Sequence, residues 1–338
     1  MSRAGEEPKP MWRQVPLAVR RQVERALGAP VRRGARVWGG YAPSPTFRLR
    51  LADGRRVFFK GVADDHPNEV IPRALAQEAR IYRQLGPLIA PCAPALYGEF
   101  HAAGWQVLLL EDLGPATIPP WTAGGVRRAA RAYADFHRAT LGRRLPRWLT
   151  GRQRWERVAG SWRQVASQPG GTEPVARLAG GAAAAGRTWL AAQLPVLLEV
   201  AGGLGRVRPP YALLHFDTRS DNIRLRGAEL RIFDWPAAWS GPPELDAVAF
   251  AQSIPCEGGP APERFLKSYA ERLPLRERVV DQAVAAMAGF FAGRAWQPEL
   301  PGLPRVRSIQ RRQLKVCLAW AARRLGLPAP DWLSAVPD

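Results

Sequence analysis

Residues 211–235 read YALLHFDTRSDNIRLRGAELRIFDW, and the fold assignment depends on this stretch. It contains two short apolar runs, one ahead of the cluster His215-Phe216-Asp217 and one ahead of Asp234. Continuous apolar runs of this length are typical of buried strands. A strand that ends in charged side chains holds them in fixed positions, so the stretch predicts two rigid polar loops.

The spacing within this stretch indicates a reaction class. The pattern His-x-Asp at 215–217, with Asn222 five positions after Asp217, matches the catalytic loop of phosphoryl-transferring kinases. In that loop the Asp orients a substrate hydroxyl and the Asn holds a magnesium ion. Asp234 stands 12 residues after Asn222, where a second metal-binding carboxylate is expected. Phosphoryl transfer needs positioning and charge neutralisation more than covalent chemistry, which such loops provide.

The composition is that of a globular protein with an unusual charge. The chain has 338 residues, 46% of them hydrophobic, and a formal net charge of +20. This length predicts two domains, or one domain with two lobes. The positive excess is almost entirely arginine scattered along the chain, which favours a solvated surface over a dedicated nucleic-acid or membrane surface.

Other sequence features point to a soluble cytoplasmic protein. Cys92, Cys256 and Cys317 lie far apart, in neither a disulfide framework nor a zinc-binding spacing, so reduced thiols are expected. Residues 1–11 lack the apolar core of a signal peptide. The most apolar stretch, 189–203, is interrupted by a proline and a glutamate and is too short to span a bilayer, which predicts a pair of soluble helices.

Residues 15–113 are predicted to be rich in strands. Phe47, Leu49 and Leu51 alternate with arginines, and Asp53-Gly54 forms a turn before the next strand. Leu75, Ala79, Tyr82 and Leu85 recur at helical spacing ahead of Gly86-Pro87. The expected elements are a helix over 15–27, a meander over 37–62, a helix from 72 to the Gly-Pro at 86–87, and strands over 95–101 and 106–110. From Trp121 onward the pattern is helical, apart from the stretch 211–235.

Three segments carry a resemblance to a known family. They are His215-Phe216-Asp217 with Asn222, then 232–235 (IFDW), then 241–247 (GPPELDA). In this order and spacing the chain resembles the aminoglycoside phosphotransferase and choline kinase-like family, relatives of the protein kinases, over roughly residues 38–250. The resemblance implies ATP or GTP as phosphate donor, magnesium, and a small molecule with a hydroxyl group as acceptor.

The resemblance also implies the architecture. The expected fold class is α+β, a bilobal protein kinase-like fold with an antiparallel sheet and one long helix in the first lobe and a mainly helical second lobe. The expected organisation is a helical extension over 1–36, a nucleotide-binding lobe over 37–113, and a helical lobe over 114–338. Trp235-Pro236 in place of Phe-Gly and the lack of an A-P-E segment argue against a protein kinase.

Roles in the second half of the chain follow from the motif. Asp217 is expected to orient the acceptor hydroxyl, while Asn222 and Asp234 bind magnesium. Arg219 stands where protein kinases carry a phosphate-facing lysine, so it is a second catalytic candidate. Asp221 fits either a third metal ligand or an exposed turn residue. The resemblance further implies that His215 and Asp246 support the loop structurally.

Lys60 is the phosphate-binding candidate in the first half. It closes the strand 57–60 in a chain that uses arginine at nearly every other basic position. A compact ammonium suits a point contact to phosphates better than a planar guanidinium does. Glu78, on the apolar side of the following helix, is its expected partner, and Glu69 is the less favoured choice.

Two further segments are expected to contact the nucleotide. The loop 39–46 should cover it, although two prolines there remove backbone donors, which leaves the hydroxyls of Ser44 and Thr46 as candidate phosphate contacts. The segment from Glu111 to Leu113, called the hinge segment below, should meet the base through backbone groups.

The charge of residues 115–210 bears on the acceptor. Arginines crowd this region and acidic residues are few, so it offers little negative potential to a polycation. We therefore expect a neutral or anionic acceptor and no nucleic acid or membrane as the primary partner. The alternative is a catalytically degenerate kinase-like scaffold that binds nucleotides or nucleic acid, for which the basic run over 305–324 is the candidate surface.

Overall fold

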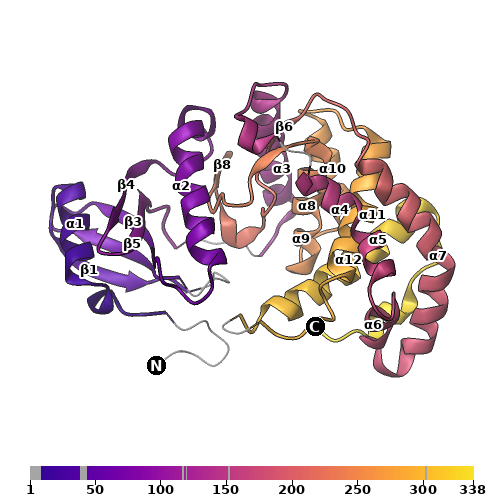
Figure 1. Cartoon of the computed structure of the whole chain (residues 1–338). Coiled ribbons are helices and arrows are strands. Elements are labelled where there is room, and N and C mark those ends of the chain that lie inside the picture. Colours follow the sequence, from indigo (N-terminus) through magenta and orange to yellow (C-terminus); the bar gives the residue numbers. More distant parts are fainter. Residues whose placement is uncertain (1–8, 39–43, 116–117, 119, 151–152, 301–302) are drawn as a thin grey trace. The chain divides into compact units, whose positions relative to one another are not determined.

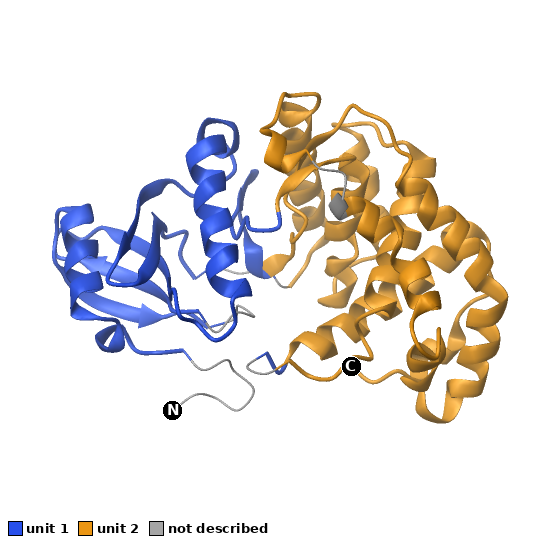
Figure 2. Ribbon diagram, in the orientation of Figure 1, with its two compact units in different colours: residues 1–118, 221–237, 301–304 blue, residues 119–220, 238–300, 305–338 orange. Residues whose placement is uncertain are grey.

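The computed structural model describes residues 9–38, 44–115, 118, 120–150, 153–300 and 303–338. The chain divides into two compact units (Figure 2). Unit 1 comprises residues 1–118, 221–237 and 301–304, and unit 2 comprises residues 119–220, 238–300 and 305–338.

Unit 1 is built on a five-stranded antiparallel sheet (Figure 1). Its strands are β1 (Val31–Arg36), β2 (Thr46–Leu51), β3 (Arg56–Ala63), β4 (Leu96–Ala102) and β5 (Trp105–Glu111), in the order β1-β2-β3-β5-β4. The alternation predicted for β2 is confirmed, since Phe47, Leu49 and Leu51 are buried. They share a core with Val19 and Val23 of α1 (Leu17–Leu27), as an apolar sheet face requires.

The sheet begins earlier than expected. β1 lies at the end of the segment 1–36 assigned to a helical extension, and the meander therefore starts at Val31 instead of residue 37. Its sequence, VRRGAR, is mostly polar, and its pairing with β2 supplies the strand's backbone partners. A short Trp12–Gln14 turn of 3-10 helix (η1) precedes α1.

The long helix of unit 1 is α2 (Val70–Ile89). Its buried face includes Leu75, Glu78, Tyr82 and Leu85, as the helical spacing predicts. The expected end at Gly86-Pro87 is wrong, because Pro87 lies inside the helix. It falls in the last turn, so the backbone hydrogen bond that it removes lies at the end of the helix.

Unit 1 is completed by a hairpin formed by part of the stretch 211–235. Strands β7 (Ile223–Arg226) and β8 (Glu229–Ile232) pair with Ile223 opposite Ile232, and Gly227 turns the chain with a φ of 57°. The backbone N–H of Ile232 donates to the carbonyl of Cys92 at 2.6 Å. The expected boundaries placed this hairpin in the helical lobe, but residues 221–237 cluster with the sheet.

Unit 2 is helical (Figure 1). Its helices are α3 (Ala123–Thr140), α4 (Gln153–Ala159), α5 (Ser161–Ser167), α6 (Glu173–Arg177), α7 (Ala183–Leu204), α8 (Pro243–Ala251), α9 (Ser253–Cys256), α10 (Pro262–Ala270), α11 (Glu277–Ala292) and α12 (Val306–Leu325). Short 3-10 turns are η2 (Arg147–Leu149), η3 (Gly180–Ala182), η4 (Ser220–Asn222), which spans the unit boundary, and η5 (Asp331–Ala335). Two short strands, β6 (Ala212–Leu214) and β9 (Trp239–Gly241), pair antiparallel.

The core of unit 2 lies around α11, where 12 of 16 residues are buried. A Cβ on Gly289 would come within 2.7 Å of the Trp162 ring, so glycine at this position lets α11 approach α5 closely. Residues 189–203 form part of the single helix α7 instead of the expected helix pair. Among the described residues, no helix combines the length and apolar character needed to cross a bilayer.

The fold class expected from the sequence is confirmed. An N-terminal antiparallel sheet with one long helix is followed by a mainly helical part. Residues 221–237, which contain the β7–β8 hairpin, and residues 301–304 are the parts of the second half that cluster with the sheet.

Candidate active site

Lys60 is positioned by the alternation of β3. Val57 and Phe59 are buried in the core of unit 1, so Lys60 belongs to the opposite face of the strand, where successive side chains alternate. Its Nζ lies 2.6 Å from Oε2 of Glu78 and 2.9 Å from Oδ1 of Asp234. Three elements of unit 1 therefore meet at one ammonium group: β3, α2 and the loop after β8.

The ion pairs keep Lys60 charged in a half-buried position. Burial by itself lowers the pKa of Lys60, but the carboxylates of Asp234 and Glu78 outweigh it and raise that pKa above the ordinary value. Burial raises the pKa of Glu78, whose side chain is 1% exposed, and Lys60 opposes that effect. The Asp234 side chain is 39% exposed, so it is the carboxylate of the three-residue cluster that has access to solvent.

The hairpin brings Asn222 and Asp234 to the same end of β7 and β8. The carbonyl of Asn222 accepts the N–H of Phe233 at 3.0 Å, and Asp234 is the next residue. Asp234 has a φ of 70°, a left-handed conformation that Asp adopts more readily than most residues. An amide oxygen and a carboxylate fit magnesium, which takes one or two protein ligands and completes its shell with water and phosphate oxygens.

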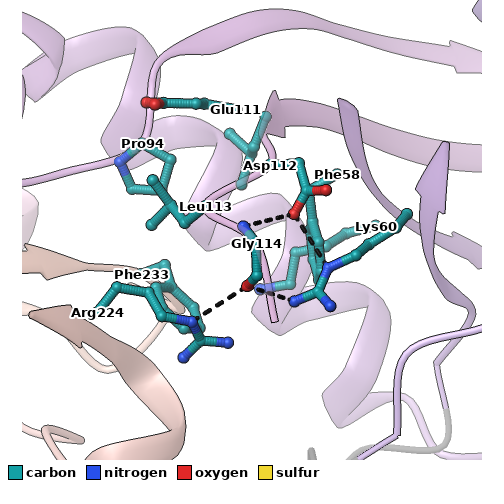
Figure 3. Close-up of a pocket in the computed structure, with 11 residues that line it drawn as sticks. Phe58, Lys60, Pro94, Glu111, Asp112, Leu113, Gly114, Arg224 and Phe233 are labelled. Carbon is teal, nitrogen blue, oxygen red and sulfur yellow. Dashed lines mark hydrogen bonds and ion pairs between the residues drawn. The ribbon is translucent and has the colours of Figure 1, made fainter. Parts of the chain in front are cut away.

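A pocket of unit 1 lies at the hinge segment (Figure 3). It is lined by Arg48, Phe58, Lys60, Pro94, Leu110, Glu111, Asp112, Leu113, Gly114, Arg224 and Phe233. Both expected base-contacting residues, Glu111 and Leu113, are therefore in its wall, together with Lys60. The carbonyl of Leu113 accepts a hydrogen bond from Arg226 at 2.7 Å.

The expected phosphate-covering loop lies partly outside the described residues, since 39–43 are not described. Ser44 is half-buried. The hydroxyl of Thr46 accepts from Nζ of Lys9 at 3.0 Å and donates to the carbonyl of Val37 at 3.2 Å. Thr46 is buried, and these bonds give its hydroxyl a structural role instead of the expected phosphate contact.

In unit 2, Asp217 and Arg219 lie in the loop after β6. The Asp217 side chain is 42% exposed, and its Oδ2 is 3.8 Å from Nη2 of Arg219. Phe216, the residue before Asp217, has a φ of 61° and stacks on Trp239 with 5.5 Å between ring centroids. A phenylalanine rarely adopts this conformation, so the surroundings must hold it there.

Asp246 holds that loop. Its carboxylate accepts the backbone N–H groups of His215 and Phe216 at 2.7 and 2.8 Å. It also accepts the hydroxyl of Tyr133 at 2.7 Å, and Nε2 of His137 lies 3.1 Å away. The side chains of Asp246 and His137 are fully buried. The bonds to consecutive backbone amides stabilise the left-handed turn at Phe216.

The network also keeps Asp246 ionised. Burial raises its pKa, but the hydrogen bonds and charge supplied by His137, Tyr133 and His215 lower it below the ordinary value overall. The ring of His215 lies 3.4 Å from the N–H of Asp217 and 3.2 Å from the hydroxyl of Thr218, which agrees with a bracing histidine.

Sequence reasoning missed three residues of these sites. Tyr133 precedes His137 by four positions on α3, and this helical spacing was the available signal for its place beside Asp246. Arg48 and Arg224 line the pocket at the hinge segment, and nothing in their local sequence distinguishes them from the chain's many other arginines.

Comparisons with known proteins agree with the fold. The family model of the phosphotransferase enzyme family matches residues 34–280, whereas no curated protein matches the chain. A candidate fructosamine-3-kinase from Thermobifida fusca YX-ER1 is 21% identical, with a TM-score of 0.50 over 94% of this chain and 98% of that one.

Two other solved structures carry nucleotides. Spectinomycin phosphotransferase, solved with ADP and spectinomycin, is 12% identical, with a TM-score of 0.56 over 96% of this chain and 98% of that one. Amicoumacin kinase, solved with AMP-PNP and Ca²⁺, is 11% identical, with a TM-score of 0.51 over 87% and 92%. These likenesses support the kinase-like fold, and the family model spans most of the chain, so this protein belongs to the phosphotransferase enzyme family.

Proposed function

We propose that the protein is a small-molecule kinase that transfers the γ-phosphate of ATP to a hydroxyl group of its acceptor. The observation that carries this is the meeting of Lys60, Glu78 and Asp234 at distances of 2.6 and 2.9 Å, beside Asn222 on the same hairpin. Such a cluster offers an ammonium to phosphates and two oxygen donors to magnesium. The solved relatives that carry ADP or AMP-PNP support an adenine nucleotide as donor.

We assign some of the site residues to binding the nucleotide and others to the transfer reaction. Lys60, held by Glu78, contacts the phosphates, and the backbone of the hinge segment meets the base. Asn222 and Asp234 hold magnesium, which neutralises charge on the phosphates. Asp217 orients the acceptor hydroxyl and takes its proton, and Arg219 stabilises charge on the transferring phosphate.

We propose a neutral or anionic acceptor, such as a sugar or another hydroxylated metabolite. Support comes from unit 2, where Arg127, Arg128 and Arg163 are exposed. A polycation would be repelled by a surface of this charge. The decisive test is a panel of hydroxylated compounds scored for ADP release: efficient phosphorylation of kanamycin-like amines, with neutral and anionic hydroxyls ignored, would exclude this proposal.

The alternative of a basic binding scaffold has less support. In unit 2, the basic side chains of α12 bond to neighbouring groups: Arg324 to Asp281 and Glu277, Lys315 to the carbonyl of Val336, and Arg307 to the carbonyl of Pro298. Basic side chains that already bond to carboxylates and carbonyls of the same unit are less available to bind the phosphates of a nucleic acid. Steeply salt-dependent nucleic-acid binding, with no nucleotide binding, would reverse this conclusion.

Replacing Asp234 by alanine should abolish magnesium-dependent nucleotide binding. A ligand at 100 times its Kd stabilises a protein by about 2.7 kcal/mol, so the wild-type chain should show a clear thermal shift with Mg·ATP. The Asp234→Ala variant should show none. Asp64→Ala is the matched control, because Asp64 is also in unit 1 and is 43% exposed. An equal thermal shift in wild type and Asp234→Ala would contradict the role of Asp234.

A further inference from the structure

Two arginines meet at one backbone carbonyl in the pocket at the hinge segment. Nη2 of Arg48 donates to the carbonyl of Gly114 at 2.6 Å, and Nε of Arg224 donates to the same oxygen at 3.3 Å. Nε of Arg48 also donates to Oδ1 of Asp112 at 3.0 Å. Figure 3 shows Arg224 and Gly114 joined in this way below the hinge segment.

The two guanidinium groups reach this carbonyl from different elements of unit 1. Arg48 is on β2, opposite Phe58 of β3. Arg224 is on β7, and its guanidinium lies over the ring of Phe233 at 4.9 Å. The sheet and the hairpin thus each contribute one aromatic ring and one arginine to the wall of the same pocket.

The contacts of Arg48 and Arg224 with the Gly114 carbonyl, called the arginine bridge below, leave little room for a ligand. The free volume of the pocket is about 30 Å³. This is space for one or two water molecules, whereas pockets that hold small organic ligands usually exceed about 300 Å³. With both guanidinium groups on the Gly114 carbonyl, the pocket therefore lacks the enclosed space that a nucleotide base needs.

The charges identify which arginine is held less firmly. Arg48 is paired with Asp112, whose side chain is 3% exposed and also accepts the N–H of Gly114 at 2.9 Å. The described contacts of Arg224 are to the carbonyls of Gly114 and Ile223 and to the Phe233 ring. Burial and the charge of Arg48 lower the pKa of Arg224, and the carboxylates of Asp221 and Asp112 oppose this shift without reversing it. Neither of these carboxylates forms a described hydrogen bond with Arg224, whereas Asp112 bonds Arg48 directly. Arg224 is thus the arginine that moves at lower cost.

We propose that Arg48 and Arg224 form a latch on the base pocket and are specificity-determining residues for the phosphate donor. Entry of the base breaks the bond between Arg224 and Gly114, while Arg48 stays on Asp112. The inference rests on the proposed function, because it assumes that this pocket receives the base. Only molecules in which the bond between Arg224 and Gly114 is broken can bind the base, so the apparent affinity for a base-bearing donor is reduced by the fraction of such molecules. A polyphosphate without a base does not enter the pocket, so its affinity is not reduced.

The test compares Mg·ATP with Mg·tripolyphosphate by titration calorimetry. The Arg224→Ala variant should bind Mg·ATP about tenfold more tightly than the wild type, because no bridge must be broken. Its affinity for tripolyphosphate, which has no base, should equal that of the wild type. Arg224→Gln, which keeps much of the side chain's bulk without its charge, should shift ATP affinity in the same direction and serves if the alanine variant does not fold.

Arg231→Ala is the matched control. Arg231 pairs with Arg224 in the hairpin register and also donates to backbone carbonyls, those of Ala90 and Ala93, but it does not line the pocket. Its loss should leave ATP affinity unchanged. Arg224 variants that bind ATP as the wild type does, or more weakly, would overturn the latch and leave the proposed function intact. If neither wild type nor variant binds ATP or tripolyphosphate, the proposed function fails and the latch with it.

Discussion

Replacing Asp217 by alanine is expected to reduce turnover by roughly 100- to 10,000-fold, the usual contribution of a positioned acid or base. Affinity for Mg·ATP should stay unchanged, because the residues proposed to bind the phosphates and magnesium before the reaction (Lys60, Asn222 and Asp234) belong to unit 1, whereas Asp217 belongs to unit 2. The carboxylate of Asp217 is 42% exposed and follows the left-handed residue Phe216, so its position is fixed while its oxygens stay accessible.

The measurement pairs ADP release, using the acceptor found in the panel, with calorimetric titration of Mg·ATP. Asp217→Asn should lose turnover to a similar degree, because an amide cannot take the hydroxyl proton. Asp135→Ala is the control, since Asp135 is a 40% exposed aspartate of unit 2 paired with Arg138 on α3. Full turnover in Asp217→Ala would remove Asp217 from the reaction, and a parallel loss of ATP binding would assign it to the donor side instead.

The contacts that the sequence predicted best rest on local periodicity. Alternation along β3 predicts that Lys60 and Phe59 face opposite sides, and helical spacing predicts that Glu78 shares the buried face of α2 with Leu75 and Tyr82. The expected pairing of Lys60 with Glu78 is present as an ion pair of 2.6 Å. The polar loops around Asp217 and Asp234 stand out because each follows a buried strand.

Long-range packing explains the elements that were mispredicted. The sequence VRRGAR of β1 lacks an apolar alternation, and the strand exists because β2 pairs with it. Pro87 and Pro195 both lie inside helices, although each predicts a break locally. In α7 the helix continues past Pro195 because residues on both sides of it, Leu190 and Leu197, are buried in unit 2.

The arginine bridge could not have been predicted from spacing either. Arg48 alternates with apolar residues as a solvent-facing strand residue does, yet its partners Asp112 and Gly114 are 64 and 66 positions away. The partner of Arg224 at Gly114 is 110 positions away. Contacts of this range depend on how the hairpin docks on the sheet, and no local pattern encodes that docking.

Replacing Asp246 by alanine is expected to destabilise unit 2 by about 3–5 kcal/mol, because each buried donor left without its acceptor costs about 1–3 kcal/mol. The change removes the acceptor of two backbone amides and of the Tyr133 hydroxyl, and it leaves His137 fully buried without its carboxylate. Urea unfolding should show the loss as a lower midpoint. Asp135→Ala, at an exposed position on the same unit, should change the free energy of unfolding by less than about 0.5 kcal/mol.

The pH dependence separates the charge of Asp246 from its packing. The pKa of Asp246 is lower in the folded chain than in the unfolded chain, so the unfolded chain takes up a proton first as the pH falls. The contribution of Asp246 to the free energy of unfolding is therefore present above about pH 4 and is lost as the pH falls through the folded pKa. Asp246→Asn keeps the shape but does not titrate. Between pH 5 and pH 3 the wild type should therefore lose more unfolding free energy than Asp246→Asn does. Equal losses would mean that the carboxylate braces the loop at residues 215–217 by shape alone, and that its charge contributes nothing to holding Phe216 in its left-handed turn.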